Sequence, residues 1–155
     1  MEKMAWCNQC KSLKRYTTET RKRSFVIKGE DITFDLDVKI CTDCKTEIFK
    51  EAYEHMDKAL NEYRKIHNLL TLPEIHEIAV SHNVTDGVFG RALGIDRMRW
   101  RDILIGSLPS TVENAAIQIA KDPAIFKKLA CLHINQLNKV EFDEIMAGEN
   151  PEKYL

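Results

Sequence analysis

The sequence predicts an α+β fold: a small N-terminal β-hairpin domain stapled by a metal ion, then an all-α helix-turn-helix domain of about five helices. Two Cys-x2-Cys pairs flank alternating, β-branched segments, and apolar residues recur at helical spacing from residue 46 onward. A glycine at position 94 separates two short helical segments. We expect residues 1–68 to form the first domain with its linking helix, and residues 69–155 to form the second.

The composition of the chain excludes some classes of protein. The chain has 155 residues and a formal net charge of -1, from 23 basic and 24 acidic side chains. This balance excludes a uniformly basic coat for nucleic acid, although it leaves room for a local basic patch. No apolar run is long enough to span a bilayer, and the N-terminus has no apolar signal segment. We therefore expect a cytoplasmic protein, in which cysteines bind metal more often than they form disulfides.

The cysteine spacing predicts a metal site. Cys7 and Cys10 form one pair and Cys41 and Cys44 the other, with thirty residues between the pairs. Two such knuckles complete a tetrahedral sulfur site, and four thiolates favour Zn2+ in a structural rather than a catalytic role. The first domain is then zinc-stapled, because its small core needs the metal to fold. The alternatives are two unrelated pairs of reduced core cysteines or a redox pair, and Cys131 is expected to be a buried apolar residue.

Two strands and a helix follow from the pattern around these pairs. Residues 24–27 and 32–41 alternate in polarity, which predicts strands joined by a turn at 28–31. Such a hairpin would bring the two knuckles together. Helical spacing predicts the linking helix over residues 46–67. Its apolar residues are Ile48, Phe49, Tyr53, Met56, Leu60 and Tyr63.

Three short helices are predicted next. Thr71, with Glu74 three residues later, caps a helix that ends near residue 83. A second begins at residue 84 and stops at Gly94, and Asp96 caps a third. Two short helices across a glycine turn indicate a helix-turn-helix, and the alternative is a generic helical bundle.

Two further helices are predicted toward the C-terminus. One covers residues 111–120, and the other covers 123–137 after an Asp-Pro start. The tail from residue 139 is acidic, and we expect residues 148–153 to be frayed.

The cysteine frame and the spacing of residues 63–110 together resemble those of a known family. The matching positions are the two cysteine pairs with their gap, residues 63–75, and Val84, Thr85, Phe89, Gly94, Gly106 and Ser110. They resemble the MqsA/YgiT-type antitoxins, in which a zinc domain, a linking helix and an Xre-like helix-turn-helix follow one another. The resemblance covers the chain to about residue 129.

The resemblance implies a function. Members of this family bind a small toxin, often a ribonuclease, through the zinc domain. They dimerise through the C-terminal domain and bind double-stranded DNA at a palindrome in their own promoter. The chain departs from the family in the third helix, where Asp102, Ile103 and Leu104 replace the usual Arg, aromatic and Glu, and Met98 replaces a polar residue.

The third helix is the candidate DNA reader. On its outer face, arginines could pair with guanine, a carboxylate could accept from cytosine N4, and a methionine could touch a thymine methyl. The alternative is a solvated face with weak exposed ion pairs. The starts of the second and third helices suit phosphate. The candidate DNA-binding residues are Thr85, Arg91, Asp96, Arg97, Met98, Arg99, Arg101 and Asp102.

A patch of basic residues lies between the cysteine pairs. Across residues 11–28 the only acidic residue is Glu19. The patch could compensate the charge of four thiolates on a metal, protect an edge strand, or dock an acidic partner. The candidate partner-binding residues are Arg15, Arg21, Lys22 and Arg23.

No enzyme is expected. The sequence has no glycine-rich phosphate loop, no metal-hydrolase histidine motif and no Ser/His/Asp pattern. Besides an antitoxin, two functions stay open: a stand-alone zinc-containing repressor of a phage or mobile element, and an adaptor whose helix-turn-helix only dimerises.

Overall fold

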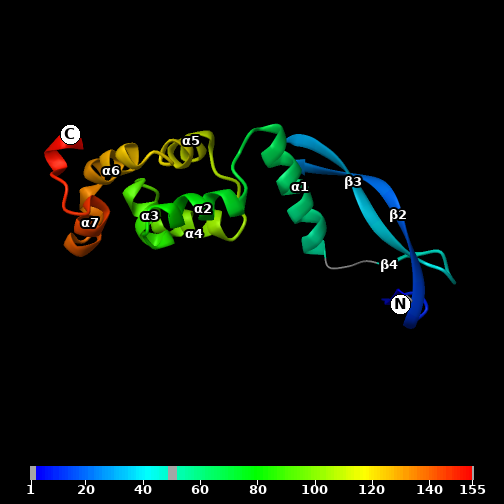
Figure 1. Cartoon of the computed structure of the whole chain (residues 1–155). Coiled ribbons are helices and arrows are strands. Elements are labelled where there is room, and N and C mark those ends of the chain that lie inside the picture. The colour runs from blue at the N-terminus through cyan, green and yellow to red at the C-terminus, as the bar shows by residue number, and fades with distance from the viewer. Residues whose placement is uncertain (1–2, 49–51, 155) are drawn as a thin grey trace. The chain divides into compact units, whose positions relative to one another are not determined.

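The structure, a computed structural model, describes residues 3–48 and 52–154, apart from the side chains of residues 52–54. The chain divides into two compact units, Met1–Ile66 and His67–Leu155. Figure 1 shows the strands in the first unit and most of the helices in the second. None of the helices in the described part of the chain has the length and apolar character that a bilayer span requires.

An antiparallel sheet with the order β1-β2-β3-β4 forms the first unit together with one helix. The β2–β3 hairpin pairs without a bulge from Tyr16 opposite Cys41 to Ile27 opposite Glu30. Lys28 and Gly29 make its two-residue turn with positive φ angles of 50° and 85°, as the right-handed twist of a hairpin requires. The strands are β1 (Met4–Cys7), β2 (Ser12–Ile27), β3 (Glu30–Cys41) and β4 (Glu47–Ile48).

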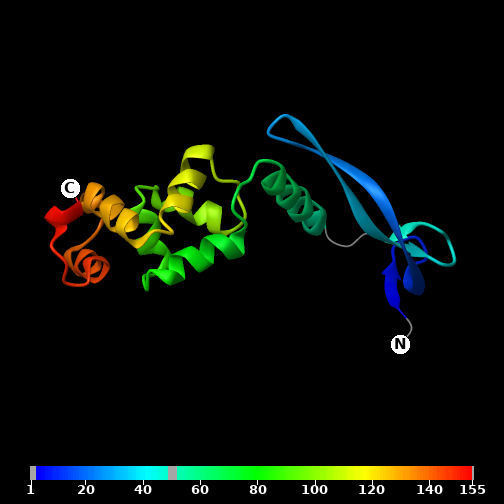
Figure 2. The ribbon, with the colours of Figure 1, turned by 45° about the horizontal axis from the view of Figure 1, so that its top comes forward.

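The core of the first unit lies between β3 and α1 (Ala52–Ile66). Alternate β3 side chains point to one face of the sheet, where α1 packs beside β3 and β2 (Figure 2). The opposite β3 face carries Asp, Thr and Lys side chains. The buried side chains are Ile32, Phe34, Leu36, Val38 and Ile40 of β3, with Ala59 and Tyr63 of α1.

The second unit is helical. Its core is built around Phe89, whose ring lies 5.7 Å from the ring of Trp100 and 5.2 Å from that of Phe126. Ile75, Ile103 and other apolar side chains close this core. The helices are α2 (Leu72–Ser81), α3 (Asp86–Ala92), α4 (Arg97–Leu104), α5 (Thr111–Ile119), α6 (Pro123–Leu132) and α7 (Lys139–Met146), with short 3-10 turns at Ile134–Gln136 and Pro151–Tyr154.

The predicted fold class was wrong in its architecture, although the chain is α+β. Instead of a hairpin domain followed by about five helices, the described residues form a four-stranded antiparallel sheet and seven α-helices. The added strands, β1 and β4, have four and two residues, which is too short for alternation to show. They form because each cysteine knuckle folds back on a neighbouring strand.

Two boundaries also differ from the prediction. The sequence places Ile48 in the linking helix, but Glu47 and Ile48 pair with β3 as β4, and α1 is described only from Ala52. Phe49 and the side chain of Tyr53 lie outside the described residues. Strand β2 begins at Ser12 rather than at residue 24, because backbone pairing defines it and its exposed, polar side chains do not.

The sequence analysis also assigned no helix to the start of the acidic tail. Residues 139–146 form α7, which Asn138 and Glu141 start with a capping box and which buries Phe142. The end of the chain is ordered by Glu149, whose carboxylate accepts hydrogen bonds from Lys127, Lys153 and the Tyr154 hydroxyl.

Candidate functional site

The two cysteine knuckles meet because the β2–β3 register brings their strands together. Cys7 ends β1, and the Cys10 amide donates to Cys7 Sγ at 3.5 Å. Cys41 ends β3, and its amide donates to the Thr46 carbonyl at 2.9 Å. Arg15 on β2 accepts from the Thr42 amide at 3.1 Å, which ties the second knuckle to the first strand pair.

The sulfur atoms of Cys7, Cys10, Cys41 and Cys44 all lie within 4.8 Å of one another. Cys7 Sγ is 3.5 Å from Cys44 Sγ, and Cys10 Sγ is 4.0 Å from Cys41 Sγ. Two of the cysteines are buried and two half-buried. The four cysteines could therefore hold a metal ion, with one sulfur from each as ligand.

The surroundings favour the thiolate form of part of this cluster. The Thr46 hydroxyl lies 2.8 Å from Cys44 Sγ and lowers the pKa of that thiol to about 6. The Cys10 amide lowers the pKa of Cys7. In contrast, the hydrogen bond between the Cys10 thiol and Cys44 Sγ raises the pKa of Cys10 to about 12. A cation bound among the sulfurs would displace the protons of the thiols that ligate it.

Thr46 is a residue of this site that the sequence analysis did not predict. Its hydroxyl touches Cys44 Sγ and lies 3.8 Å from Cys7 Sγ. Groups that hold ligands from outside the coordination shell change metal affinity by about 10–100-fold when removed. We expect Thr46→Val to weaken metal binding by about 10-fold, measured by competition with a chromophoric chelator.

Thr42→Val is the matched control for that measurement. Thr42 lies in the same knuckle, but its hydroxyl donates to the Arg15 carbonyl and has no sulfur contact among the described residues. An equal loss of affinity in both variants would assign the effect to the knuckle backbone and not to the Thr46 hydroxyl.

Helices α3 and α4 cross at a close contact. A Cβ at Gly90 would lie 2.5 Å from Trp100 Cγ, so only glycine admits the indole at this distance. Gly94 (φ +74°) makes the turn between the helices, and a Cβ there would meet the His133 ring at 2.5 Å. His133 Nδ1 also lies 3.0 Å from the Ala92 carbonyl. The angle between α3 and α4 is thus fixed by packing on both sides of the turn.

The structure divides the candidate DNA-binding residues into three groups. Thr85 and Asp96 are the N-caps of α3 and α4, and their side chains accept from backbone amides. Arg91 pairs with Glu141 of α7. The exposed residues of α4 for which the described part of the chain offers no ion pair are Arg97, Met98, Arg101 and Asp102.

Arg99 is a structural residue of this helix. Its Nε and Nη2 atoms each donate to Glu113 at 2.7 Å, and Nη2 also donates to the Leu108 carbonyl at 2.8 Å. Glu113 belongs to the capping box of α5, and the Arg99 guanidinium holds the pKa of its carboxyl at about 2. This bidentate pair fastens α4 to the start of α5.

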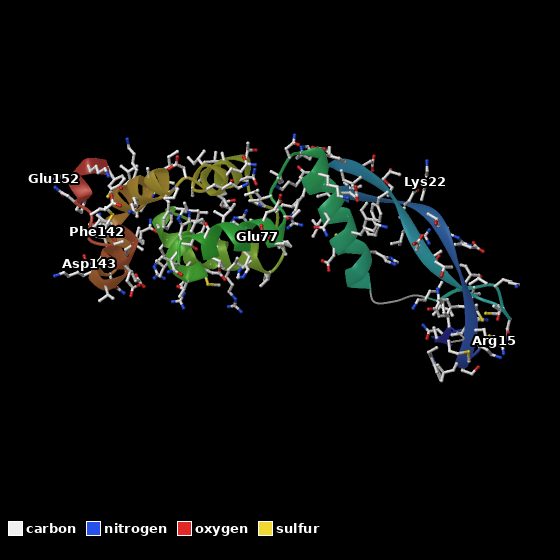
Figure 3. All side chains as sticks on the ribbon, in the orientation of Figure 1. Arg15, Lys22, Glu77, Phe142, Asp143 and Glu152 are labelled. Carbon is white, nitrogen blue, oxygen red and sulfur yellow. The ribbon has the colours of Figure 1, made fainter. Side chains whose placement is uncertain are left out.

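Some of the basic side chains on β2 form ion pairs within the first unit. Arg23 donates to Glu47 at 2.5 Å, and Arg21 lies 3.6 Å from the same carboxylate, which is only 10% exposed. Arg21 also pairs with Glu19 at 3.0 Å. Lys22 points to the other face of the strand (Figure 3), where it lies opposite Asp35 and is exposed. The four predicted partner-binding residues, Arg15 among them, therefore do not form one continuous basic surface.

The sequence analysis did not predict the contacts that position α4 or those that neutralise the arginines of β2. Gly90, His133 and Glu113 position α4, and Glu47 neutralises two arginines of β2. Only Glu113 carries a local signal, because Ser110 with a glutamate three residues later predicts a capping box. The other contacts join residues far apart in the sequence, so no local pattern reveals them.

Comparison with known proteins gives no family for the chain. No protein-family profile, curated protein or solved structure matches it. Its function therefore has to be inferred from its own residues.

Proposed function

We propose that this protein is an antitoxin-like transcriptional regulator. As a homodimer it binds a palindrome in its own promoter through α3 and α4, and it binds a cognate toxin through the metal-bearing unit. The observation that carries the proposal is the exposed face of α4, whose side chains have no ion pair in the described chain while the helix itself is fixed at Gly90, Gly94 and Arg99. A rigid helix with free side chains suits recognition of another molecule.

Structural Zn2+ fits the cysteine cluster. With bonds of about 2.3 Å, a tetrahedral zinc site has sulfur–sulfur distances of about 3.8 Å. The distances of 3.5 Å and 4.0 Å bracket this value. Four thiolates fill every position around the ion, which favours a structural role over a catalytic one.

The chemistry of α4 supports binding to the major groove. Arg97 and Arg101 are exposed on successive turns, as phosphate or guanine contacts would need. Met98, 61% exposed, offers an apolar contact to a thymine methyl. Asp102 can accept a hydrogen bond from cytosine N4, and away from a cytosine it would repel phosphate. The face therefore suits a sequence-specific contact better than a purely electrostatic one.

The DNA proposal is tested by selection from random duplexes at low salt, followed by affinity measurements on the enriched site. We expect Arg101→Ala to cost about 1–3 kcal/mol of binding free energy, because an arginine that contacts a base carries specificity. Lys139→Ala is the control, since it removes an exposed positive charge from α7 and leaves α4 unchanged. Arg99 is unsuitable for this test, because its loss would release α4 from Glu113.

Two outcomes of the selection count against DNA binding. If no duplex is enriched, or if Lys139→Ala weakens binding as much as Arg101→Ala, the unit is better described as an adaptor that dimerises without reading DNA. Asp102 on the exposed face of α4 is the observation that favours this alternative, because its charge opposes phosphate.

The toxin part of the proposal has its own experiment. Each small protein encoded beside this chain is expressed alone and then with the wild-type chain, and growth is recorded. We expect the wild type to restore growth and Cys41→Ser to fail, because the variant lacks one of the four ligands. If no neighbouring product is neutralised, the protein is a stand-alone regulator and the DNA proposal stands by itself.

A further inference from the structure

An exposed apolar surface covers one face of the β1–β2 ribbon, next to the cysteine cluster. Met4 is 48%, Trp6 56% and Leu13 61% exposed. We call these three residues the Trp6 patch. Arg15, labelled in Figure 3, lies on the same strand as Leu13.

The strand register explains why the Trp6 patch is uncovered. Trp6 pairs with Leu13 and Met4 pairs with Arg15, so these side chains share one face of the ribbon. The alternate side chains, Ala5 among them, turn to the other face and pack against the cysteine cluster. One face of the ribbon therefore builds the metal end of the unit, and the described chain places no element over the opposite face.

The composition of the Trp6 patch is typical of a protein interface. Scattered apolar side chains are normal on a surface, but here a tryptophan and two aliphatic side chains lie together. Tryptophan is enriched among the residues that dominate binding energy, especially when smaller apolar groups surround it. A nucleobase would stack on the indole, but the flanking Met4 and Leu13 favour an apolar pocket over a polar base and its phosphate.

The charge around the patch indicates the kind of partner. From residue 3 to residue 18 the sequence holds Lys3, Lys11, Lys14 and Arg15 and no acidic residue. Lys14 is paired with Asp43, on the face with the cysteines. Lys3 and Lys11 are exposed beside the ribbon. A second copy docking through the same patch would bring like charges together, whereas an acidic partner would be attracted.

We propose that the Trp6 patch is the docking surface for an acidic protein partner, which takes the Trp6 indole into an apolar pocket. The inference deepens the proposed function and rests on it in one respect: this partner is the protein that the metal-bearing unit recognises. It moves the expected contact from Arg21 and Arg23, which Glu47 occupies, to the face opposite the cysteines.

The test uses the full-length protein, purified with zinc, as bait for two displayed libraries: random linear peptides and a helical scaffold with random surface positions. We expect enriched binders to combine acidic residues with a cluster of apolar ones. Their affinity should fall at least about 10-fold with Trp6→Ala, as for a central interface tryptophan, and decrease with added salt. Val26→Ala is the matched control, since Val26 is an apolar residue at the other end of β2 and, at 69%, is more exposed than Trp6.

Several outcomes would overturn the proposal. Enrichment of basic or uncharged binders would remove the acidic partner, and binders that ignore Trp6→Ala would remove the patch. Self-association that Trp6→Ala abolishes in analytical ultracentrifugation would assign the patch to a second copy, and Trp6-dependent binding to phosphatidylserine vesicles would assign it to a membrane. Metal content of each variant shows that the unit is folded.

The failure of this inference can be told apart from failure of the proposed function. DNA selection and growth rescue depend on α4 and on the cysteines, and neither uses the displayed libraries. If Trp6→Ala leaves rescue of growth intact, the toxin binds elsewhere and the docking proposal falls while the antitoxin proposal remains.

Discussion

Removing the metal is expected to unfold the first unit while the helical unit stays folded. Structural zinc in small domains contributes about 10–16 kcal/mol of apparent binding free energy, which is comparable to the stability of a whole domain, about 5–15 kcal/mol. The cysteine end has little else: its buried cluster consists of Cys7, Cys41 and Ile48, with a few half-buried neighbours. Chelator titration followed by amide exchange should show loss of protection in β1 to β4 and retention in α2 to α7.

The same result is expected from Cys41→Ser, with Cys131→Ser as its control. Cys131 is buried in the helical unit and takes no part in the sulfur cluster. Its replacement should leave metal content at that of the wild type, whereas Cys41→Ser should lose the metal. If the chelated protein keeps its β2–β3 amide protection, the packing of β3 against α1 is sufficient and the metal only closes the end of the sheet.

The metal site was the part of the molecule most open to prediction. Residue type and spacing predict the ligands of a metal, and the four cysteines lie close together in the structure. What the spacing could not reveal is the support around them, because Thr46 and the strand pairing of Arg15 depend on how the chain folds back. The identity of the ion stays a prediction.

The sheet was harder to predict, for a physical reason. Alternation in a strand reports burial of one face, and β3 shows it because α1 covers its apolar side. The middle of β2, residues 17–22, is exposed on both faces, so its side chains carry no pattern although its backbone is paired with β3. Strands β1 and β4 exist only as consequences of the knuckles. Local sequence patterns cannot predict such strand pairings.

The helical unit followed its local signals more closely. The capping boxes at Thr71 and Ser110 and the glycine turn at Gly94 mark helix ends that the structure contains. The tail was misjudged by its acidic composition, although Asn138 and Glu141 carry the same capping signal. The roles of Arg91 and Arg99 depend on Glu141 and Glu113, which the sequence places 50 and 14 residues away.

Two glycines of α3 offer the sharpest test of the α3–α4 crossing. A methyl group at Gly90 would lie 2.5 Å to 2.7 Å from three ring atoms of Trp100. The indole cannot give way easily, because Trp100 is 3% exposed and packs against Phe89. At Gly87, in the same helix, a methyl group would meet only Arg91 Nη1, at an ordinary 3.7 Å.

The two substitutions should therefore act in opposite directions. Gly90→Ala is expected to destabilise the helical unit by about 1–3 kcal/mol, the usual cost of overpacking, and to lower its melting temperature by about 4–8 °C for each kcal/mol. Gly87→Ala is expected to be neutral or to stabilise it by up to about 1 kcal/mol, since alanine restricts the unfolded chain and favours helix. Calorimetry measures both, and the transition of the first unit, which should be unchanged in each variant, is the internal reference. Because the clash pushes α4 away from α3, Gly90→Ala should also weaken the binding of any duplex selected by the wild type, while Gly87→Ala should retain it. Equal behaviour of the two variants would mean that the indole of Trp100 does not lie on Gly90, and the rigid placement of α4 would lose its main support.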